Sequence, residues 1–388
     1  MGNATITEDS ISFEPTEEMK LLKQSAREFA ESEIRPVVMK YDESQEFHLD
    51  IMKKMADLGF LGAVTPEDLG GAGMTAKEFI VIMEELARVD PSVALTFAAH
   101  SGLCLEHLLQ FANDEQKKKY IPDLATGKKI GSWCLTEPGS GSDAGAMLTM
   151  AERKGSEYVL NGSKSFITNG SYASTFVVMA KTGTDKGKLQ TSAFIVEKGM
   201  GVQVGRKENK LGFRSSDTVQ LVFENVRVPA ANLLGEEGQG LKQALSVLDS
   251  GRVGIAALSV GLAQGAMEAS IKYAGERKAF GKTLGEFQGI QFKLADMATE
   301  IEASRLLTYR AAVAKSAGSP LTLVAAYAKY FASEVAQRVA SEAVQIHGGY
   351  GFIKEFPVEK FYRDVKLLTI GEGTSEVQRM VIAKNLLF

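Results

Sequence analysis

The sequence has few of the residues that build disulfide-rich or metal-binding proteins. Its 388 residues include two cysteines, Cys104 and Cys134, and four histidines. Two cysteines cannot form the disulfide framework of a small secreted domain, and both lie among apolar neighbours, so we expect buried free thiols. The histidines do not have the spacing of metal ligands, and we expect no metal site.

The sequence also lacks a strong charge of either sign and a long apolar run. Lysine and arginine number 44 against 48 aspartate and glutamate, a net charge of −4. This balance excludes the basic surface of a nucleic-acid-binding protein. No run of 18 apolar residues occurs, and the N-terminus lacks the charged-then-apolar pattern of a signal sequence. We therefore expect no membrane span and a cytoplasmic location.

Hydrophobic residues make up 45% of the chain, enough for a substantial core, and its length favours two or three domains. Residues 1–13 have the composition of a loose tail. Residues 14–130 show helical periodicity, including an apolar helix from Val93 through Leu109 that is expected to be buried. Residues 238–388 return to helical patterns, which predict a four-helix bundle with helices at about 239–275, 286–316, 320–347 and 375–387.

Between the two helical parts, residues 131–237 carry short β-rich runs. Turn signals at Asn161-Gly162, Asn169-Gly170 and Asp185-Lys186-Gly187 separate these runs, and two of the runs are Val219–Phe223 and Val226–Val228. No helices alternate with them, so we expect an antiparallel sandwich or barrel rather than βαβ units. The predicted fold class is α+β.

Near the C-terminus, Glu372 stands between two glycines, just before a predicted helix. Ser375 is expected to be the N-cap of this helix, with Gln378 in capping-box position. The glycines allow close approach of a ligand and leave the carboxylate uncrowded, which suits a general base acting on a bound substrate. The alternative is a glycine-rich turn that carries a solvated acid.

A second glycine-rich loop spans residues 139–143. It is not a dinucleotide fingerprint, because it lacks the βαβ context and the acid about 20 residues further on. It can instead offer backbone N–H groups and hydroxyls to a ligand.

Six segments, in the same order along about Glu14 to Phe388, resemble the acyl-CoA dehydrogenase family, in particular its short-chain and branched-chain members, the butyryl-CoA and isovaleryl-CoA dehydrogenases. They are residues 136–143, 161–164, 166–170, 277–281, 345–351 and the loop around Glu372. The resemblance implies the three-domain fold outlined above, an FAD cofactor, an acyl-CoA substrate, electron-transfer flavoprotein as the electron acceptor, and a homotetramer.

The resemblance also implies roles for individual residues. Glu372 would remove the α-proton while a hydride passes from the β-carbon to flavin N5, giving the trans-2-enoyl-CoA. The isovaleryl relative carries its base at the position of Gly251, where glycine cannot act as one. The residues implied to line the flavin ring are Trp133, Leu135, Thr136, Gly141, Ser142, Phe166 and Thr168. Those implied to contact the rest of FAD, across a subunit interface, are Arg277, Phe280, Leu284, Gln288, Gln345, Gly348, Gly349, Thr374 and Glu376. Those implied on the substrate side are Ser142, Asp249, Arg252, Gly371 and Gly373.

Two features favour short, branched or cyclic acyl chains. Gly371 stands where straight-chain relatives often carry tyrosine, and residues 98–104 resemble the pocket helix of the short-chain and isovaleryl members. Glycine could also serve loop geometry alone. Three alternative functions stay open: an acyl-CoA oxidase, an enzyme that reduces enoyl-CoA in vivo, and a non-catalytic scaffold that binds acyl-CoA or flavin.

Overall fold

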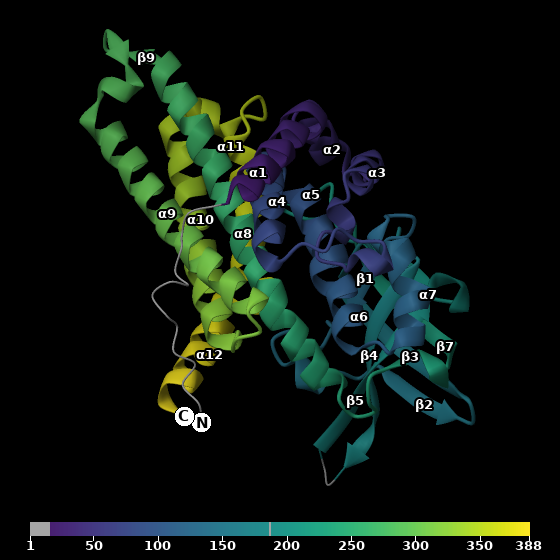
Figure 1. The fold of residues 1–388 in the computed structure, drawn as a ribbon. Helices are drawn as coiled ribbons and strands as arrows, with labels where there is room; N and C mark the ends of the chain where they lie inside the picture. Colours follow the sequence, from purple (N-terminus) through teal and green to yellow (C-terminus); the bar gives the residue numbers. More distant parts are fainter. Residues whose placement is uncertain (1–15, 186–187) are drawn as a thin grey trace.

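A computed structural model describes residues 16–185 and 188–388, and its chain is arranged in three parts (Figure 1). The loose tail expected at residues 1–13, and Lys186-Gly187 of one expected turn, lie outside the described residues. The N-terminal part is helical, the middle part is a sheet, and the C-terminal part is a bundle of long helices. The order of the three parts is the one expected from the sequence.

The N-terminal part packs short helices around one long buried segment. The helices are α1 (Glu17–Phe29), α2 (Val38–Ser44), α3 (Leu49–Asp57), α4 (Ala76–Val89), α5 (Pro91–Phe97), α6 (Glu106–Phe111) and α7 (Asp114–Ala125). A π-helical segment, Ala98–Leu105, joins α5 to α6, so residues 91–111 form a continuous helix. Asp90 begins it by accepting a hydrogen bond from Ser92 N at 2.9 Å, with Pro91 in the first turn. Most of its residues are buried, as predicted.

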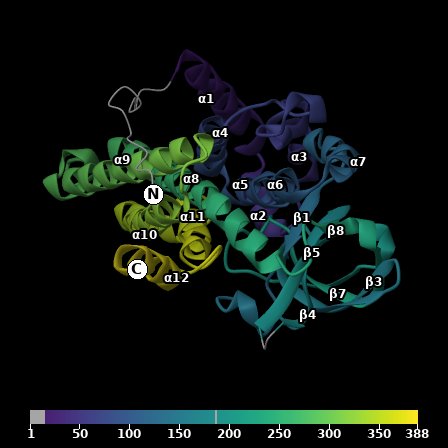
Figure 2. The same cartoon turned by 60° about the horizontal axis from the view of Figure 1, so that its bottom comes forward.

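The middle part is an eight-stranded sheet, seen from another side in Figure 2. Its strands are β1 (Gly131–Cys134), β2 (Met150–Lys154), β3 (Glu157–Thr168), β4 (Thr175–Asp185), β5 (Lys188–Glu197), β6 (Gln203–Lys207), β7 (Thr218–Pro229) and β8 (Leu233–Leu234). The order is β6-β7-β3-β2-β4-β5-β8, with β1 added beside β4. Pairing is mainly antiparallel, as predicted, but β1 and one residue of β2 pair with β4 in parallel.

Two local predictions in the sheet are wrong. The runs Val219–Phe223 and Val226–Val228 belong to one strand, β7. Asn161-Gly162 is no turn, because it lies inside β3 at an irregularity in the pairing with β7. A Cβ on Gly162 would lie 2.6 Å from Thr149 Oγ1, so glycine is needed there for close contact between neighbouring backbones. Asn169-Gly170 does turn the chain, with Asn169 in the left-handed region.

The C-terminal part contains α8 (Gly240–Glu276), α9 (Gln288–Ser316), α10 (Thr322–His347), α11 (Val358–Asp364) and α12 (Ser375–Leu387). The four predicted helices agree with α8, α9, α10 and α12 to within two residues, whereas α11 was not predicted. A small hairpin, β9 (Lys278–Ala279) and β10 (Lys282–Thr283), connects α8 to α9. Helix α8 is long and apolar enough to cross a membrane, but 78% of its apolar window is buried inside the fold, as in the core helix of a bundle.

The expected cap of the last helix is wrong by one residue. The N-cap is Thr374, whose hydroxyl accepts a hydrogen bond from Val377 N at 3.3 Å. Ser375 is the first helical residue, and its hydroxyl donates to Glu334 of α10 at 2.6 Å. The tertiary contact therefore determines which of the two adjacent hydroxyls caps the helix.

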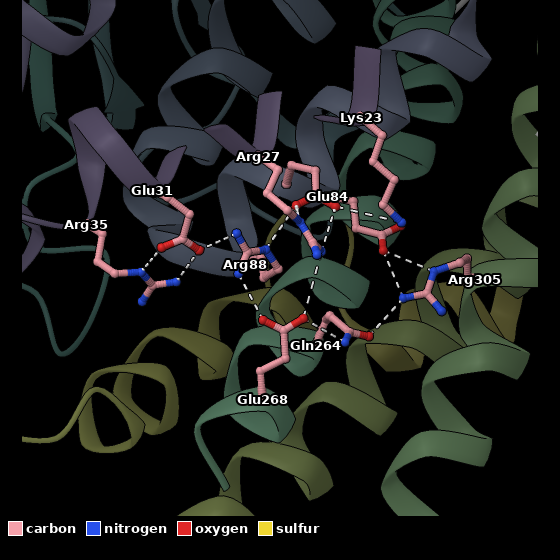
Figure 3. A network of polar contacts seen from close by, with 10 residues as sticks. Lys23, Arg27, Glu31, Arg35, Glu84, Arg88, Gln264, Glu268 and Arg305 are labelled. Atoms are coloured by element: carbon pink, nitrogen blue, oxygen red, sulfur yellow. Dashed lines mark hydrogen bonds and ion pairs between the residues drawn. The ribbon is translucent and has the colours of Figure 1, made fainter. Parts of the chain in front are cut away.

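A network of charged side chains joins the N-terminal part to the bundle (Figure 3). At its centre, the side chain of Arg88 in α4 is only 4% exposed and donates to Glu85, Glu268 and Glu31 at 2.9, 2.9 and 2.5 Å. Arg305 of α9 contacts Glu84 of α4 at 2.8 Å. These bonds fix α4 against α8 and α9, and α4 forms one wall of the cavity described next.

Candidate active site

A small cavity lies between α4, the helix of residues 91–111, and α8. Its volume is ≈ 10 Å³, room for about one water molecule. It is lined by Val64, Phe79, Ala98, Ser101, Gly102, Glu106, Ser250, Gly251, Gly254, Lys315 and Glu372. Glu372 is thus part of an internal cavity, which argues against the alternative of a solvated acid on a turn.

Glycine at position 251 makes room for the carboxylate. A Cβ on Gly251 would lie 2.3 Å from Glu372 Oε2 and 2.9 Å from Leu103 Cδ2, both too close. A side chain at position 251 and the carboxylate of Glu372 therefore compete for one space.

The surroundings of Glu372 favour its neutral form. The residue as a whole is half-buried, but its atom Oε2 is buried and has no hydrogen-bond partner among the described residues. Burial raises the pKa of Glu372 to about 7, and the charges of Lys329 and Arg252 offset part of this rise. The fold itself provides this burial.

The backbone of the Glu372 loop is unusual and is held by two side chains. Glu372 has φ 54° and Gly373 has φ 92°, both in the left-handed region. Lys329 of α10 donates to the carbonyl oxygen of Gly373 at 2.7 Å, and Gln378 of α12 donates to the carbonyls of Glu372 and Gly373 at 3.2 and 3.1 Å. Sequence reasoning missed Lys329; the signal was a lysine within an alanine-rich stretch of helix.

The other substrate-side residues lie close to this loop. Arg252 is buried, not on a helix surface, and donates to Asp249 at 2.5 Å, while Asp249 accepts a hydrogen bond from Thr322 at 2.5 Å. Asp249 and Arg252 therefore form a largely buried i, i+3 ion pair. Gly371 has no left-handed backbone, and an added Cβ would lie 3.5 Å from the Leu367 carbonyl oxygen, an ordinary contact, so a side chain can be accommodated here.

The glycine-rich loop at residues 139–143 stands on a buried ion pair. Lys164 Nζ lies 2.7 Å from Glu137 Oε1, and Glu137 also accepts from the N–H groups of Leu148 and Thr149 at 2.6 and 3.0 Å. Gly141 and Ser142 of the loop are exposed. The buried ion pair therefore holds the loop in place, while Gly141 and Ser142 remain exposed for a ligand.

Aromatic residues flank this loop. Trp133 of β1 and Leu135 are buried, and the Trp133 indole donates to His107 Nδ1 at 2.9 Å. Phe166 of β3 is 65% exposed although its φ is 58°, a strained position for a bulky residue. An exposed, strained aromatic side chain is typical of a ligand site. Thr136 and Thr168 are half-buried beside these residues in the sequence.

A second, open cleft of ≈ 700 Å³ lies where α8, α9 and α10 meet the hairpin. Five residues implied to bind FAD line it: Arg277, Leu284, Gln345, Gly348 and Gly349. Arg277 lies over the ring of Tyr350, 5.2 Å from its centroid. Phe280 and Gln288 do not line the cleft, and Phe280, at the hairpin, is 96% exposed.

The remaining two residues implied to bind FAD lie at the start of α12. Thr374 caps this helix, and the Glu376 side chain is 74% exposed, 3.7 Å from Arg379. Neither residue lines one of the two cavities described above.

Comparison with known proteins gives matches along nearly the whole chain. Family models match residues 16–128 (acyl-CoA dehydrogenase, N-terminal domain), 132–226 (middle domain) and 238–387 (C-terminal domain). The short-chain specific acyl-CoA dehydrogenase of Clostridium acetobutylicum is 46% identical over 372 residues, 96% of this chain and 98% of the relative.

Two further proteins are similar to nearly the same extent. Subunit CarC of the caffeyl-CoA reductase-Etf complex of Acetobacterium woodii is 45% identical, over 96% of this chain and 99% of its own. The structure of butyryl-CoA dehydrogenase from Megasphaera elsdenii has a TM-score of 0.95 and 43% identity, and the match covers 97% of this chain and 100% of that one.

Proposed function

We propose, since the chain belongs to the acyl-CoA dehydrogenase family of FAD-dependent oxidoreductases, that it dehydrogenates short acyl-CoA thioesters with Glu372 as the base. The observation that carries this proposal is the carboxylate of Glu372, buried against a cavity with a pKa near 7. A general base works best when its pKa lies near the working pH.

In the proposed reaction the substrate loses one hydrogen from each of two neighbouring carbons. Glu372 takes the α-proton with the electron-rich Oε2, which has no competing hydrogen bond among the described residues. FAD supplies, when bound, the acceptor for the hydride that leaves the β-carbon. The two C–H bonds are replaced by a C=C bond, and the product is the trans-2-enoyl-CoA. The buried site excludes water from the charge that develops on the thioester.

The two ligand-like regions of the chain fit an FAD shared between subunits. The exposed loop with Gly141 and Ser142 and the wall of Phe166 suit a planar ring with polar edges. The Arg277 guanidinium suits the diphosphate, because it can hold phosphate oxygens in bidentate fashion. In Figure 1 the β9 hairpin and the sheet lie at opposite ends of the molecule, so one FAD cannot easily contact both within one chain.

A homotetramer would bring these regions together from different chains. Large apolar side chains are exposed near the hairpin and on the last helix, among them Phe280, Phe292, Met380 and Leu387. The hairpin and the last helix lie at opposite ends of the bundle, and exposed apolar side chains at both ends favour contacts between subunits. Electron-transfer flavoprotein is the proposed electron acceptor, supported by the similarity to CarC, a subunit of a complex with Etf.

Phe79 supports a preference for short acyl chains. A Cβ on Gly102 or on Gly254 would lie 3.4 Å from the Phe79 ring, so this ring packs across both glycines and forms part of the wall of the cavity that contains Glu372. The absence of a side chain at Gly371, next to the base, fits a branched or cyclic chain. The nearby short-chain and butyryl-CoA relatives agree with a short substrate.

The test is anaerobic titration of the FAD-loaded protein with butyryl-, isobutyryl-, isovaleryl-, cyclohexanoyl-, octanoyl- and palmitoyl-CoA. We expect each acyl-CoA that reacts to bleach the flavin absorbance. In rate measurements with the same panel, we expect the highest kcat/KM for a short or branched chain. The variant Glu372→Gln is expected to keep FAD and lose roughly 10²–10⁴-fold in rate. A variant with more than a tenth of the wild-type rate would place the base elsewhere, and a maximum at octanoyl-CoA or longer would refute the short-chain preference.

Reduction of an enoyl-CoA is a second candidate function, favoured by the similarity to a subunit of a caffeyl-CoA reductase complex. With a pKa near 7, Glu372 is partly protonated at neutral pH and can return a proton to the α-carbon. Mixing prereduced holoenzyme with crotonyl-CoA tests this direction, because reoxidation faster than the forward reaction would favour it. Peroxide formation in air would instead indicate an oxidase.

A further inference from the structure

Lys329 is a buried cation that donates a hydrogen bond to the loop that carries Glu372. Its side chain is fully buried, and it lies in an alanine-rich part of α10. Among the described residues it forms no ion pair within 4 Å, and its Nζ donates to the carbonyl oxygen of Gly373 at 2.7 Å. A buried charge is costly unless its surroundings compensate for it, so this placement calls for an explanation.

Gln378 holds the same stretch of backbone from the other side. It is fully buried in α12, and its Nε2 donates to the carbonyl oxygens of Glu372 and Gly373. The loop needs such support, because a non-glycine residue in the left-handed region, here Glu372, is strained and persists only where its surroundings enforce it. Lys329 and Gln378 together anchor two consecutive carbonyls of this loop.

The charges around the loop make Lys329 the leading cation for Glu372. The charge of Lys329 lowers the pKa of Glu372 more than that of Arg252 does, and Arg252 is itself paired with Asp249. The charges of Glu334 and Glu376 also raise the pKa of Lys329. Glu106 and Lys315, 3.0 Å apart, line the cavity as an ion pair. Burial lowers the pKa of Lys329 to about 8, so it is still mainly charged at neutral pH.

We propose that Lys329 and Gln378 are positioning residues for Glu372: together they hold the loop so that the carboxylate faces the cavity, and Lys329 alone also stabilises its charged form. The proposal rests on the proposed role of Glu372 as the base. The two residues separate positioning of the loop from stabilisation of the charged carboxylate, because the neutral amide of Gln378 can position the loop but adds no charge.

The experiment compares Lys329→Met and Gln378→Leu, both close to the original residues in size, in the FAD-loaded protein. The rate of flavin reduction by saturating butyryl-CoA is measured anaerobically from pH 5.5 to 9. Lys360→Met is the control, because Lys360 is an equally buried lysine that contacts Asp90 and Asp364 rather than the loop. FAD content and Tm are recorded for every variant.

We expect Lys329→Met to raise the apparent pKa of the rate by about one unit, since a nearby opposite charge lowers a carboxylate pKa by about 1–3 units. Gln378→Leu is expected to lower the rate at least tenfold at every pH without moving this pKa. Lys360→Met is expected to lower Tm and leave the pKa of the rate where it is.

The proposal is overturned if Lys329→Met keeps the wild-type pH profile, if Lys360→Met shifts it equally, or if Gln378→Leu reacts at the wild-type rate. Should Lys329→Met fail to fold or bind FAD, Gln378→Leu decides. Glu372→Gln is measured alongside: if it stays active, the proposed function itself fails, whereas an inactive Glu372→Gln with an unchanged Lys329→Met profile removes the inference alone.

Discussion

Replacing Gly251 by alanine should disturb the base without disturbing the fold. The new Cβ would lie 2.3 Å from Glu372 Oε2, and an ordinary contact begins at 3.4 Å, so the carboxylate must move by about 1 Å. A misplacement of this size costs roughly 100-fold in rate when it affects reacting groups. Alanine also suits a helix interior better than glycine, by up to about 1 kcal/mol, so the effect should appear in catalysis and not in Tm.

Gly254, one turn further along α8, provides a matched control. A Cβ there would meet Phe79 at 3.4 Å and Met83 at 4.0 Å, which are ordinary contacts. Stopped-flow flavin reduction by butyryl-CoA should therefore be about 100-fold slower in Gly251→Ala and nearly unchanged in Gly254→Ala, with equal FAD content. Gly251→Ala within threefold of the wild-type rate would refute the view that this glycine makes room for the base.

Three further predictions follow from the same structure. Phe79→Leu should raise the octanoyl-to-butyryl ratio of kcat/KM at least tenfold, since each methylene that fits is worth about 1–3 kcal/mol. Phe97→Leu should leave this ratio unchanged, because the Phe97 ring packs on Phe79 but does not line the cavity. Because folding raises the pKa of Glu372 from 4.5 to about 7, the rate should rise with pH through about 7. For the same reason the folded protein should lose stability as the pH rises from 4.5 to about 7, and denaturant titrations of Glu372→Gln should not show this loss. Arg88→Met should lower the free energy of unfolding by about 3–5 kcal/mol, because it removes the buried cation shared by Glu85, Glu268 and Glu31 and leaves Glu85 with the more exposed Arg27 and Lys23; a loss below about 1 kcal/mol would contradict this.

The sequence predicted those features that depend on local patterns. The three-part organisation followed from a change in hydrophobic period near residues 131 and 238, and the long helices agree with α8, α9 and α10 to within two residues. Glu372 was predicted from its flanking glycines and the family resemblance. The role of Glu372 as the base stays a prediction, and the burial that raises its pKa comes from helices far away in the sequence.

The errors have a common cause in tertiary contacts. Asn161-Gly162 has the sequence of a hairpin turn, but Gly162 is required by the approach of Thr149 inside the sheet. Ser375 is as good an N-cap as Thr374, but a bond to Glu334 engages its hydroxyl. The local signal of Lys329 was a lysine in an alanine-rich stretch of helix, which does not reveal its partner, because its contact with the loop of Glu372 joins residues 44 positions apart.

Glycines show most clearly why the remainder of the site could not be predicted. Gly251, Gly371 and Gly373 all lie near the base, yet each meets a different need. Gly251 leaves space for the carboxylate, Gly373 adopts a left-handed backbone, and Gly371 requires neither, since an added Cβ meets only ordinary contacts. A sequence shows glycine in each case, whereas only the neighbours in space distinguish a backbone requirement from an opening. Gly371 is therefore the position where an introduced side chain would narrow the site at the least cost to the fold. Gly371→Tyr tests this directly, because it should change the ratio of kcat/KM between branched and straight acyl chains.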